Sequence, residues 1–283
     1  MLSAYKIYSP DKKWRAEISA RLGSNVTKLQ YEGKDVFIPL NSNEQLEKDP
    51  FLIGCPMLFP ANRTYKGEFE FEGKKYQLPI NDSLEVAHLH GFLYCQKFNL
   101  IEISEHKIGL SYENSGDIYP FRFSITVEYS LENNAFEQRY IIKNTDSKNM
   151  PYTFALHTAF VEPEFFTVPI DFCQEKDEKH IPTGKYIPLN EQEKGYVADG
   201  KSKNVVISGY YHSCGNIAYV GDYKYTVSQN FDHWILYNGR GQAGLLCVEP
   251  QCGAVNGLNL VDGFKTLKPD GCEVFSTIIT KIN

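Results

Sequence analysis

The chain has 283 residues, of which 42% are hydrophobic, 14% aromatic and 23% charged, a composition that excludes a disordered chain and predicts a globular protein with a large core. Its formal net charge of −6 excludes broad attraction to nucleic-acid phosphates or anionic lipid, so we expect no nucleic-acid and no membrane partner. Because all-β proteins of this length often form one unit, we expect a single domain over residues 1–283.

Residues 1–6 lack the apolar stretch of a signal peptide, and no apolar run approaches the roughly 18 residues of a membrane span. We therefore expect a cytoplasmic protein if the source is bacterial. The seven cysteines form no C-x-x-C pair, which favours reduced thiols over a disulfide framework or a zinc site.

The N-terminal part alternates between apolar and polar residues in short bursts separated by Gly or Asn. This pattern predicts three short strands, at 16–20, 26–31 and 36–38. Residues 67–80 then alternate strictly, with Phe69 and Phe71 on one arm, Tyr76 on the other and Gly73 at the bend. This stretch predicts a β-hairpin.

Period-2 alternation continues along the middle of the chain and predicts strands at 98–103, 108–112, 121–131 and 136–142. No amphipathic helix of useful length lies between them, so we expect packed antiparallel sheets rather than parallel strands with crossover helices. Residues 172–202 are rich in charge, Pro and Gly and predict a long surface excursion that can form one wall of a site. Strands resume at Val205 and end with 273–280.

Residues 239–244 match the glycine pattern of a dinucleotide-binding loop, but that loop works only when a helix N-terminus follows it. Here 245–248 read as a buried strand, so we interpret 239–244 as a hairpin loop. At the end of that strand stands Glu249, directly before Pro250. A carboxylate at this point either ends the strand in water or faces a pocket.

Each of several other side chains has either a structural or a functional interpretation. His88 and His90 have the spacing that puts both on one face of a strand, but no carboxylate or cysteine at a familiar ligand spacing accompanies them, and we expect no metal. His157 interrupts an apolar segment, so it is either a satisfied core histidine or acts on a ligand. Arg63 follows a proline-broken apolar run and either faces solvent or presents its donors to a ligand.

Taken in order, short motifs resemble the aldose 1-epimerase (mutarotase) family from about residue 14 to the C-terminus: 55–63, 69–76, His90-Gly91-Phe92, His157-x-x-Phe160, Phe231-Asp232-His233 and 247–251. The resemblance implies an all-β fold, a large antiparallel β-sandwich of the galactose mutarotase-like kind. It also implies an isomerase that interconverts the α and β anomers of a hexose. By motif position it implies Glu249 as general base, His157 as general acid, and sugar-binding roles for Arg63, His90 and Asp232.

The chemistry of anomerisation is consistent with these roles. One base must take the proton of the C1 hydroxyl and one acid must protonate the ring oxygen, so neither a metal nor a cofactor is required. We expect the two groups on opposite sides of the sugar, with His157 kept protonated by a nearby carboxylate. Phe160 or Trp234 could pack against the sugar's C–H face.

Two departures from the family pattern, Thr158-Ala159-Phe160 after the second histidine and Pro250 after the glutamate, leave the sugar open between glucose and galactose. The sequence is also compatible with three functions other than anomerisation of a free hexose. A carbohydrate-binding β-sandwich would use the same residues without turnover. A glycoside hydrolase would need two flanking carboxylates, for which Asp232 and Glu249 are the candidates. A sugar-phosphate epimerase would need cations near Arg63 that the local sequence does not show.

Overall fold

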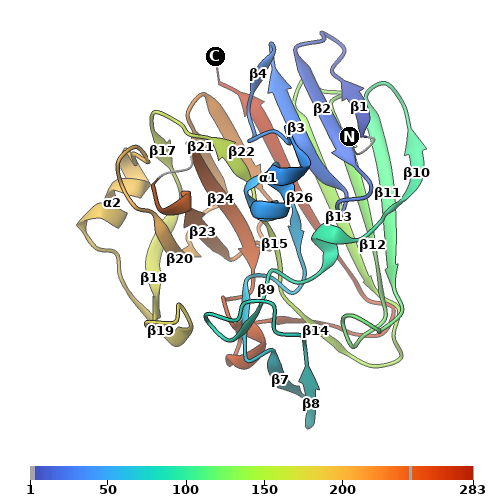
Figure 1. Ribbon diagram of the computed structural model, residues 1–283, viewed down its shortest axis with the longest axis vertical. Helices are drawn as coiled ribbons and strands as arrows, with labels where there is room; N and C mark the ends of the chain where they lie inside the picture. Colours follow the sequence, from blue (N-terminus) through green and yellow to red (C-terminus); the bar gives the residue numbers. More distant parts are fainter. Residues whose placement is uncertain (1–3, 242–243, 283) are drawn as a thin grey trace.

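A computed structural model describes residues 4–241 and 244–282. Two eight-stranded sheets, antiparallel throughout, form its bulk (Figure 1). The first sheet runs in the order β10 (Asn99–Ile103), β11 (Lys107–Asn114), β12 (Phe123–Ser130), β13 (Phe136–Asn144), β26 (Cys272–Lys281), β22 (Tyr223–Val227), β21 (Ile217–Val220) and β17 (Phe166–Thr167).

The second sheet contains Glu249, and His157 lies in the connection between two of its strands. Its order is β19 (Pro182–Pro188), β18 (Ile170–Lys176), β20 (Ser208–Ser213), β23 (His233–Tyr237), β24 (Leu245–Cys252), β15 (Phe154–Leu156) and β5 (Met57–Leu58), with β16 (Ala159–Val161) also paired to β24.

Smaller sheets and short helices complete the described residues. A four-stranded sheet contains β1 (Tyr5–Tyr8), β2 (Trp14–Ser19), β3 (Asn25–Tyr31) and β4 (Lys34–Asp35), and the two-stranded pairs are β14 (Met150–Tyr152) with β25 (Lys265–Leu267), β6 (Arg63–Tyr65) with β9 (Ala87–Leu89), and β7 (Glu68–Phe71) with β8 (Lys74–Gln77). The helical segments are α1 (Asn43–Lys48), α2 (Glu191–Ala198) and the single 3-10 turns η1 (Pro50–Leu52), η2 (Leu93–Cys95), η3 (Gly239–Gly241) and η4 (Gly257–Asn259).

The core lies between the two large sheets and explains why they pack as a sandwich. Along β12 buried and half-buried residues alternate, as expected for a strand with one covered face. Phe123 and Ile125 of β12 belong to the same buried cluster as Phe154 of β15 and Val248 of β24. The predicted all-β class and the large antiparallel β-sandwich are therefore confirmed.

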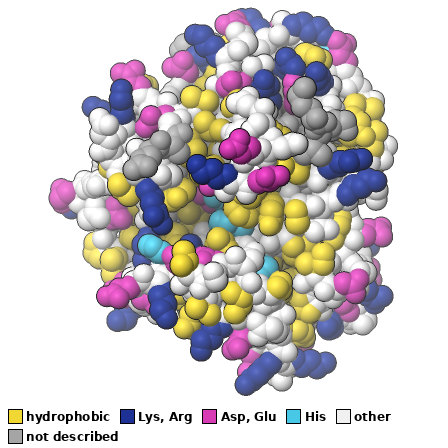
Figure 2. All heavy atoms as spheres, viewed as in Figure 1, with side chains coloured by type: hydrophobic (Ala, Val, Ile, Leu, Met, Phe, Trp, Pro, Cys, Tyr) yellow, Lys and Arg dark blue, Asp and Glu magenta, His cyan; other side chains and the backbone are white. Residues whose placement is uncertain are grey.

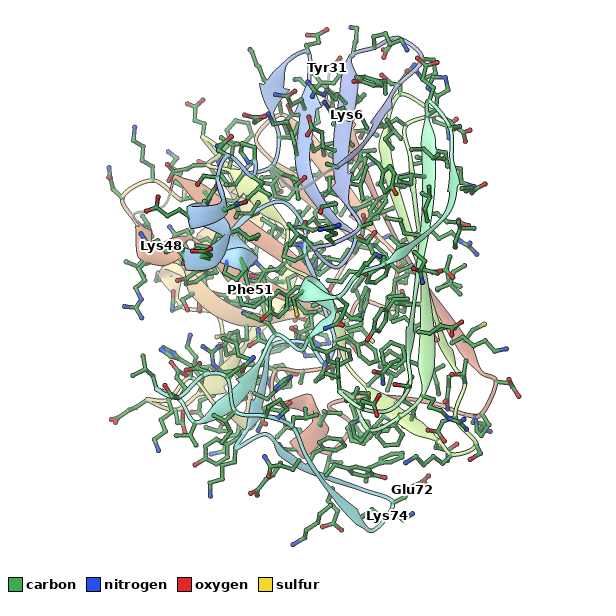
Figure 3. The ribbon with its side chains drawn as sticks, turned by 45° about the vertical axis from the view of Figure 1, so that its right-hand side comes forward. Lys6, Tyr31, Lys48, Phe51, Glu72 and Lys74 are labelled. Carbon is green, nitrogen blue, oxygen red and sulfur yellow. The ribbon has the colours of Figure 1, made fainter. Side chains whose placement is uncertain are left out.

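Several predicted elements are confirmed, among them the hairpin, whose tip between β7 and β8 carries Glu72 and Lys74 (Figure 3). The predicted strand at 36–38 is wrong, because β4 ends at Asp35 and Phe37 makes only an isolated bridge. The predicted surface position of 172–202 is confirmed, but the stretch is not irregular, since it contains most of β18, all of β19 and α2.

The other sequence-level expectations concern cysteines, membrane spans and the 239–244 loop. All seven cysteines are free thiols. Within the described residues, the helices are too short and too polar for any of them to cross a membrane. The predicted hairpin loop begins as η3 after β23, while its residues 242–243 lie outside the described residues.

Candidate active site

Strand β24 is buried on both faces, which explains why its sequence reads as a continuous apolar run. Leu246 and Val248 face the main core, whereas Cys247 packs on the opposite face with Leu52 of η1. Because side chains alternate along a strand, Glu249 lies on the same face as Cys247 and away from the main core. There Glu249 reaches a cavity of about 630 Å³.

The expectation that the strand ends at Glu249 is wrong, because β24 continues through Pro250 to Cys252. Proline removes a backbone donor and usually breaks a central strand. Here Pro250 falls between two separate pairings of β24, with β15 at residues 251–252 and with β16 at residues 245–247. Glu249 is therefore held in mid-strand, with its side chain 1% exposed.

The cavity opens on the face seen in Figure 2, where histidine side chains lie in a hollow bordered by hydrophobic, basic and acidic side chains. Four of the five predicted site residues line it: Glu249, His157, Arg63 and His90. Its volume falls in the range of small-molecule sites and is ample for a monosaccharide. Segments far apart in sequence therefore converge on one cavity.

His157 lies in the two-residue break between β15 and β16, where its N–H donates to the Pro56 carbonyl at 2.9 Å. Its Nε2 lies 3.4 Å from Oε1 of Glu249, and both side chains are buried. Among the described residues, His157 Nδ1 and Glu249 Oε2 have no hydrogen-bond partner. The two groups thus contact each other at the bottom of the cavity, and each keeps a second polar atom available. The expectation that they lie on opposite sides of a sugar is wrong for this sugar-free site, because they are in direct contact.

Burial sets the protonation of this pair. It raises the pKa of Glu249 well above its ordinary value, an effect that the charge of Arg63 opposes only in part, and it lowers the pKa of His157 to about 4. Burial therefore favours the uncharged forms of both groups in the sugar-free site. The expectation of a protonated His157 is wrong for this state, because loss of hydration on burial disfavours the charged imidazolium.

Pairing of β6 with β9 brings His90 next to the start of β6. Arg63 pairs with Leu89, and the His90 N–H donates to the Asn62 carbonyl at 2.8 Å. His90 has φ of +63° and Gly91 has φ of +67°, and a Cβ at Gly91 would lie 2.1 Å from the Phe59 carbonyl oxygen. The His-Gly motif is thus the turn that aims the imidazole into the cavity.

This turn also separates the two histidines that the sequence placed on one strand face. His88 lies within β9, and its Nδ1 is 2.7 Å from the Pro79 carbonyl oxygen. The His90 ring lies past the end of β9, 5.1 Å from the ring of His157. The expected shared face is therefore wrong, because the strand ends before His90 and the backbone turns left-handed there.

Arg63 is fixed by groups around its guanidinium. It donates to the Tyr210 hydroxyl at 2.9 Å, and its Nε lies 3.2 Å from Glu85 Oε2 and its Nη2 3.8 Å from Asp82 Oδ2. With 17% of its side chain exposed, Arg63 presents a held cation at the cavity wall.

Asp232 does not join the other four, so the expectation that it shares their cavity is wrong. Its Oδ1 accepts hydrogen bonds from His233 Nδ1 and the Gly253 N–H, both at 2.7 Å, and its Oδ2 lies 3.0 Å from Lys265 Nζ. Burial alone would raise the pKa of Asp232, but these contacts outweigh it and lower that pKa to about 2. The carboxylate is therefore already satisfied, outside the cavity lining.

The aromatic residues proposed to pack against a sugar are also different from those expected. Phe160 and Trp234 are almost completely buried in the core. Phe51 and Tyr210 line the cavity instead, with Phe51 4.4 Å from the His90 ring. Figure 3 shows Phe51 next to α1. No sequence motif marked either residue: Phe51 lies in η1 and the buried Tyr210 in β20.

Basic side chains from distant segments also reach the cavity. Lys48 at the end of α1, Arg240 in η3 and His180 line it together with Arg63. His180 Nε2 lies 3.5 Å from Glu85 Oε1, while Lys48 and Arg240 have no ion-pair partner among the described residues. The cations that the local sequence near Arg63 lacked are thus supplied by the fold.

Comparison with known proteins gives three kinds of likeness. The aldose 1-epimerase family profile matches residues 8–260. The uncharacterised protein YihR of Escherichia coli K12 is 25% identical over 171 residues, covering 57% of this chain and 54% of YihR, so the match spans about half the length of that relative.

Solved structures share the fold at low sequence identity. A galactose mutarotase-like protein from Clostridium acetobutylicum superposes with a TM-score of 0.87 at 22% identity, over 95% of this chain and 93% of that chain. A GalM/aldose epimerase homologue from C. elegans gives 0.83 at 16% identity, over 99% of both chains. Galactose 1-epimerase from Lactobacillus acidophilus NCFM gives 0.75 at 18% identity, over 96% of this chain and 93% of that chain.

Proposed function

This chain belongs to the aldose 1-epimerase family, and we propose that it interconverts the α and β anomers of a free hexose, with Glu249 and His157 as the proton-transfer pair. The observation that carries the proposal is the 3.4 Å contact between His157 Nε2 and Glu249 Oε1 at the bottom of a cavity large enough for a sugar. A buried acid and base in contact, with perturbed pKa values, is the arrangement that proton-transfer chemistry requires.

The reaction needs one base and one acid at neighbouring oxygens, O1 and O5, which are bonded to the same carbon. Groups that contact each other can therefore reach both. Transfer of the shared proton from Glu249 to His157 gives a carboxylate and an imidazolium. The carboxylate takes the O1 proton while the imidazolium protonates O5, and the C1–O5 bond opens to the aldehyde.

Ring closure reverses these transfers. After rotation about C1–C2, O5 attacks the other face of the carbonyl, His157 takes the O5 proton and Glu249 returns a proton to O1. The pair ends with the proton count it began with, and each transfer contributes on the order of 10²–10⁴ in rate. The second oxygen of Glu249, which lacks a described partner, is available to a sugar hydroxyl.

Other cavity residues would orient the sugar. Arg63 and His90 lie beside the proton-transfer pair and offer hydrogen bonds to hydroxyl groups. Phe51, which lines the same cavity, offers an apolar face for the sugar's C–H groups. Asp232 is left out of this assignment, because its oxygens are taken by His233, Gly253 and Lys265.

Polarimetry on freshly dissolved α-D-glucose and α-D-galactose tests the proposal. We expect mutarotation faster than in buffer alone, reduced about 10²–10⁴-fold in Glu249→Gln and in His157→Asn. Matched controls outside the cavity are Glu164→Gln and His212→Asn, which should keep the wild-type rate. Circular dichroism checks that each variant is folded.

Two outcomes would reject this proposal. Binding of a free hexose without any acceleration would favour a carbohydrate-binding module. Unaltered rates in both Glu249→Gln and His157→Asn would place the chemistry elsewhere. Hydrolysis is the weaker alternative, because Asp232, the expected second carboxylate, does not line the cavity with Glu249.

A second candidate is epimerisation of a sugar phosphate, which the cavity cations favour. Lys48 and Arg240 supply positive charge that a neutral hexose does not need. Under this alternative, glucose 6-phosphate would be turned over with a lower KM than glucose, and Lys48→Gln with Arg240→Gln would raise only the KM for the phosphate. Equal loss for both sugars would reject it.

A further inference from the structure

Cys247 stands beside the proposed proton-transfer pair but takes no part in the proposed reaction. It precedes Glu249 by two residues on β24, so both side chains lie on one face of the strand. The ligand-type atoms of Cys247, Glu249 and His157 all lie within 4.8 Å of one another, and all three residues are buried. We call these three residues the Cys-His-Glu cluster.

The donor set and its spacing match a tetrahedral metal site. Thiolate, imidazole and carboxylate are the ligands that zinc takes in proteins. Bonds of about 2.0–2.1 Å to nitrogen and oxygen separate two tetrahedral ligand atoms by roughly 3.3–3.4 Å. The observed separation of His157 Nε2 and Glu249 Oε1 is 3.4 Å. The sulfur needs to approach by little more than about 1 Å to complete three ligands.

A second observation independently points to a ligand here. Glu249 is 1% exposed, yet its Oε2 has no hydrogen-bond partner among the described residues, and the same holds for His157 Nδ1. A buried carboxyl oxygen left without a partner is costly unless something binds it. Metal-bound histidines normally donate their other nitrogen to a fixed partner, and His157 has none described, so the site suits a reversibly bound ion.

We propose that the Cys-His-Glu cluster binds a thiophilic divalent cation, Zn²⁺ or Cd²⁺, which enters through the cavity and inhibits the epimerase. Binding displaces the thiol proton of Cys247 and the proton shared by Glu249 and His157, and releases both to solvent. Inhibition follows because the ion occupies the Nε2 and carboxylate that must exchange protons with the sugar. Mg²⁺ and Ca²⁺ prefer oxygen ligands and should not compete.

The inhibitory part rests on the proposed function, whereas metal binding does not, so the test measures them separately. The full chain, with the exposed Cys95, Cys214 and Cys272 replaced by Ser, is freed of metal with EDTA and titrated with Cd²⁺. We expect one equivalent to produce the ultraviolet thiolate-to-cadmium charge-transfer band. Cys247→Ala should abolish the band, while Cys173→Ala, a matched thiol outside the cluster, should retain it.

Inhibition is then measured with Zn²⁺, each variant relative to its own rate in EDTA. We expect Cys247→Ser and Cys247→Ala to raise the inhibitory Zn²⁺ concentration at least tenfold, and Mg²⁺ to have no effect. If Cys247→Ala does not fold, His157→Asn tests the same band from a second ligand. A band that survives both substitutions overturns the site, and a bound ion that leaves the rate unchanged overturns the inhibition. A protein with no mutarotase activity but an intact band overturns the proposed function alone.

Discussion

Two histidine–carboxylate contacts lie close together on the second sheet and behave in opposite ways. His233 pairs with Gln251 and Ile235 pairs with Glu249, so the two sites are neighbours on β23 and β24. His233 Nδ1 lies 2.7 Å from Asp232, and its Nε2 lies 2.6 Å from the Tyr186 hydroxyl. This is a saturated network, in which each polar atom of the imidazole has a partner.

The second contact, between His157 and Glu249, is longer and its outer atoms have no described partner. Accordingly the pKa of Asp232 falls to about 2, whereas burial raises that of Glu249 well above its ordinary value. A histidine beside a carboxyl group is therefore part of a complete hydrogen-bond network at one place and keeps polar atoms without a described partner at the other. The number of hydrogen-bond partners separates the two roles.

The largest expected effect is the acid limb of the pH–rate profile. Below about pH 4, His157 binds a second proton and the pair loses its base, so kcat/KM should fall about tenfold for each further pH unit. The profile is measured between pH 3 and 7 in EDTA, over the range in which circular dichroism shows a folded protein. Asp232→Asn should keep this limb.

An acid limb with an apparent pKa near 6.5, the ordinary value for histidine, would contradict the difference proposed between the two histidine–carboxylate contacts. It would mean that the ring of His157 titrates like an exposed imidazole, so that burial does not set its protonation.

The contrast between the two contacts could not be predicted from sequence, although much of the fold could. Strands such as β12 and β13 alternate strictly because one face is buried, and this period is visible in the residues. The strand and helix within 172–202 cannot be predicted from sequence, because β19 and α2 bury almost nothing and their sequences carry no hydrophobic period.

A site residue can be predicted from sequence where a motif reflects local backbone geometry. It cannot be predicted where the role of a side chain depends on contacts made by the folded chain. The His90-Gly91 turn is readable because only glycine fits beside Phe59. Asp232 lies in a matching motif directly before β23, yet in the folded chain its oxygens are taken by His233, Gly253 and Lys265. Cys247 lies within the 247–251 motif, but its proximity to His157 exists only in the folded chain. Phe51 lies in no motif, and its contact with His90 likewise depends on the fold.

Asp232→Asn should lower the free energy of unfolding at pH 7 by about 1–2 kcal/mol, allowing for the 31% exposure of the Asp232 side chain. The pKa of Asp232 is lower in the folded state than its ordinary value of 3.8, so its stabilisation is complete above pH 4–5, roughly, and is lost as the pH falls toward 2. Urea unfolding of both proteins at pH 7 and pH 3 measures this difference.

The same urea unfolding measurement on Glu249→Gln gives a comparison with Asp232→Asn. Because burial raises the pKa of Glu249, its carboxyl group opposes folding at neutral pH, and its removal should not lower stability. A loss in Glu249→Gln equal to that in Asp232→Asn would show that both carboxyl groups are structural.

The smallest expected effect comes from the outer end of the saturated network. A carboxylate only accepts hydrogen bonds, so His233 Nδ1 carries a proton toward Asp232, and in the neutral ring Nε2 accepts from the Tyr186 hydroxyl. Tyr186→Phe removes this one bond and should cost about 0.5–1 kcal/mol by urea unfolding, because the residue is partly exposed. Tyr219→Phe, at a similarly exposed tyrosine on β21, should cost less. Equal costs would show that the hydroxyl of Tyr186 adds nothing to the network, and that Asp232 alone holds the ring of His233 in place.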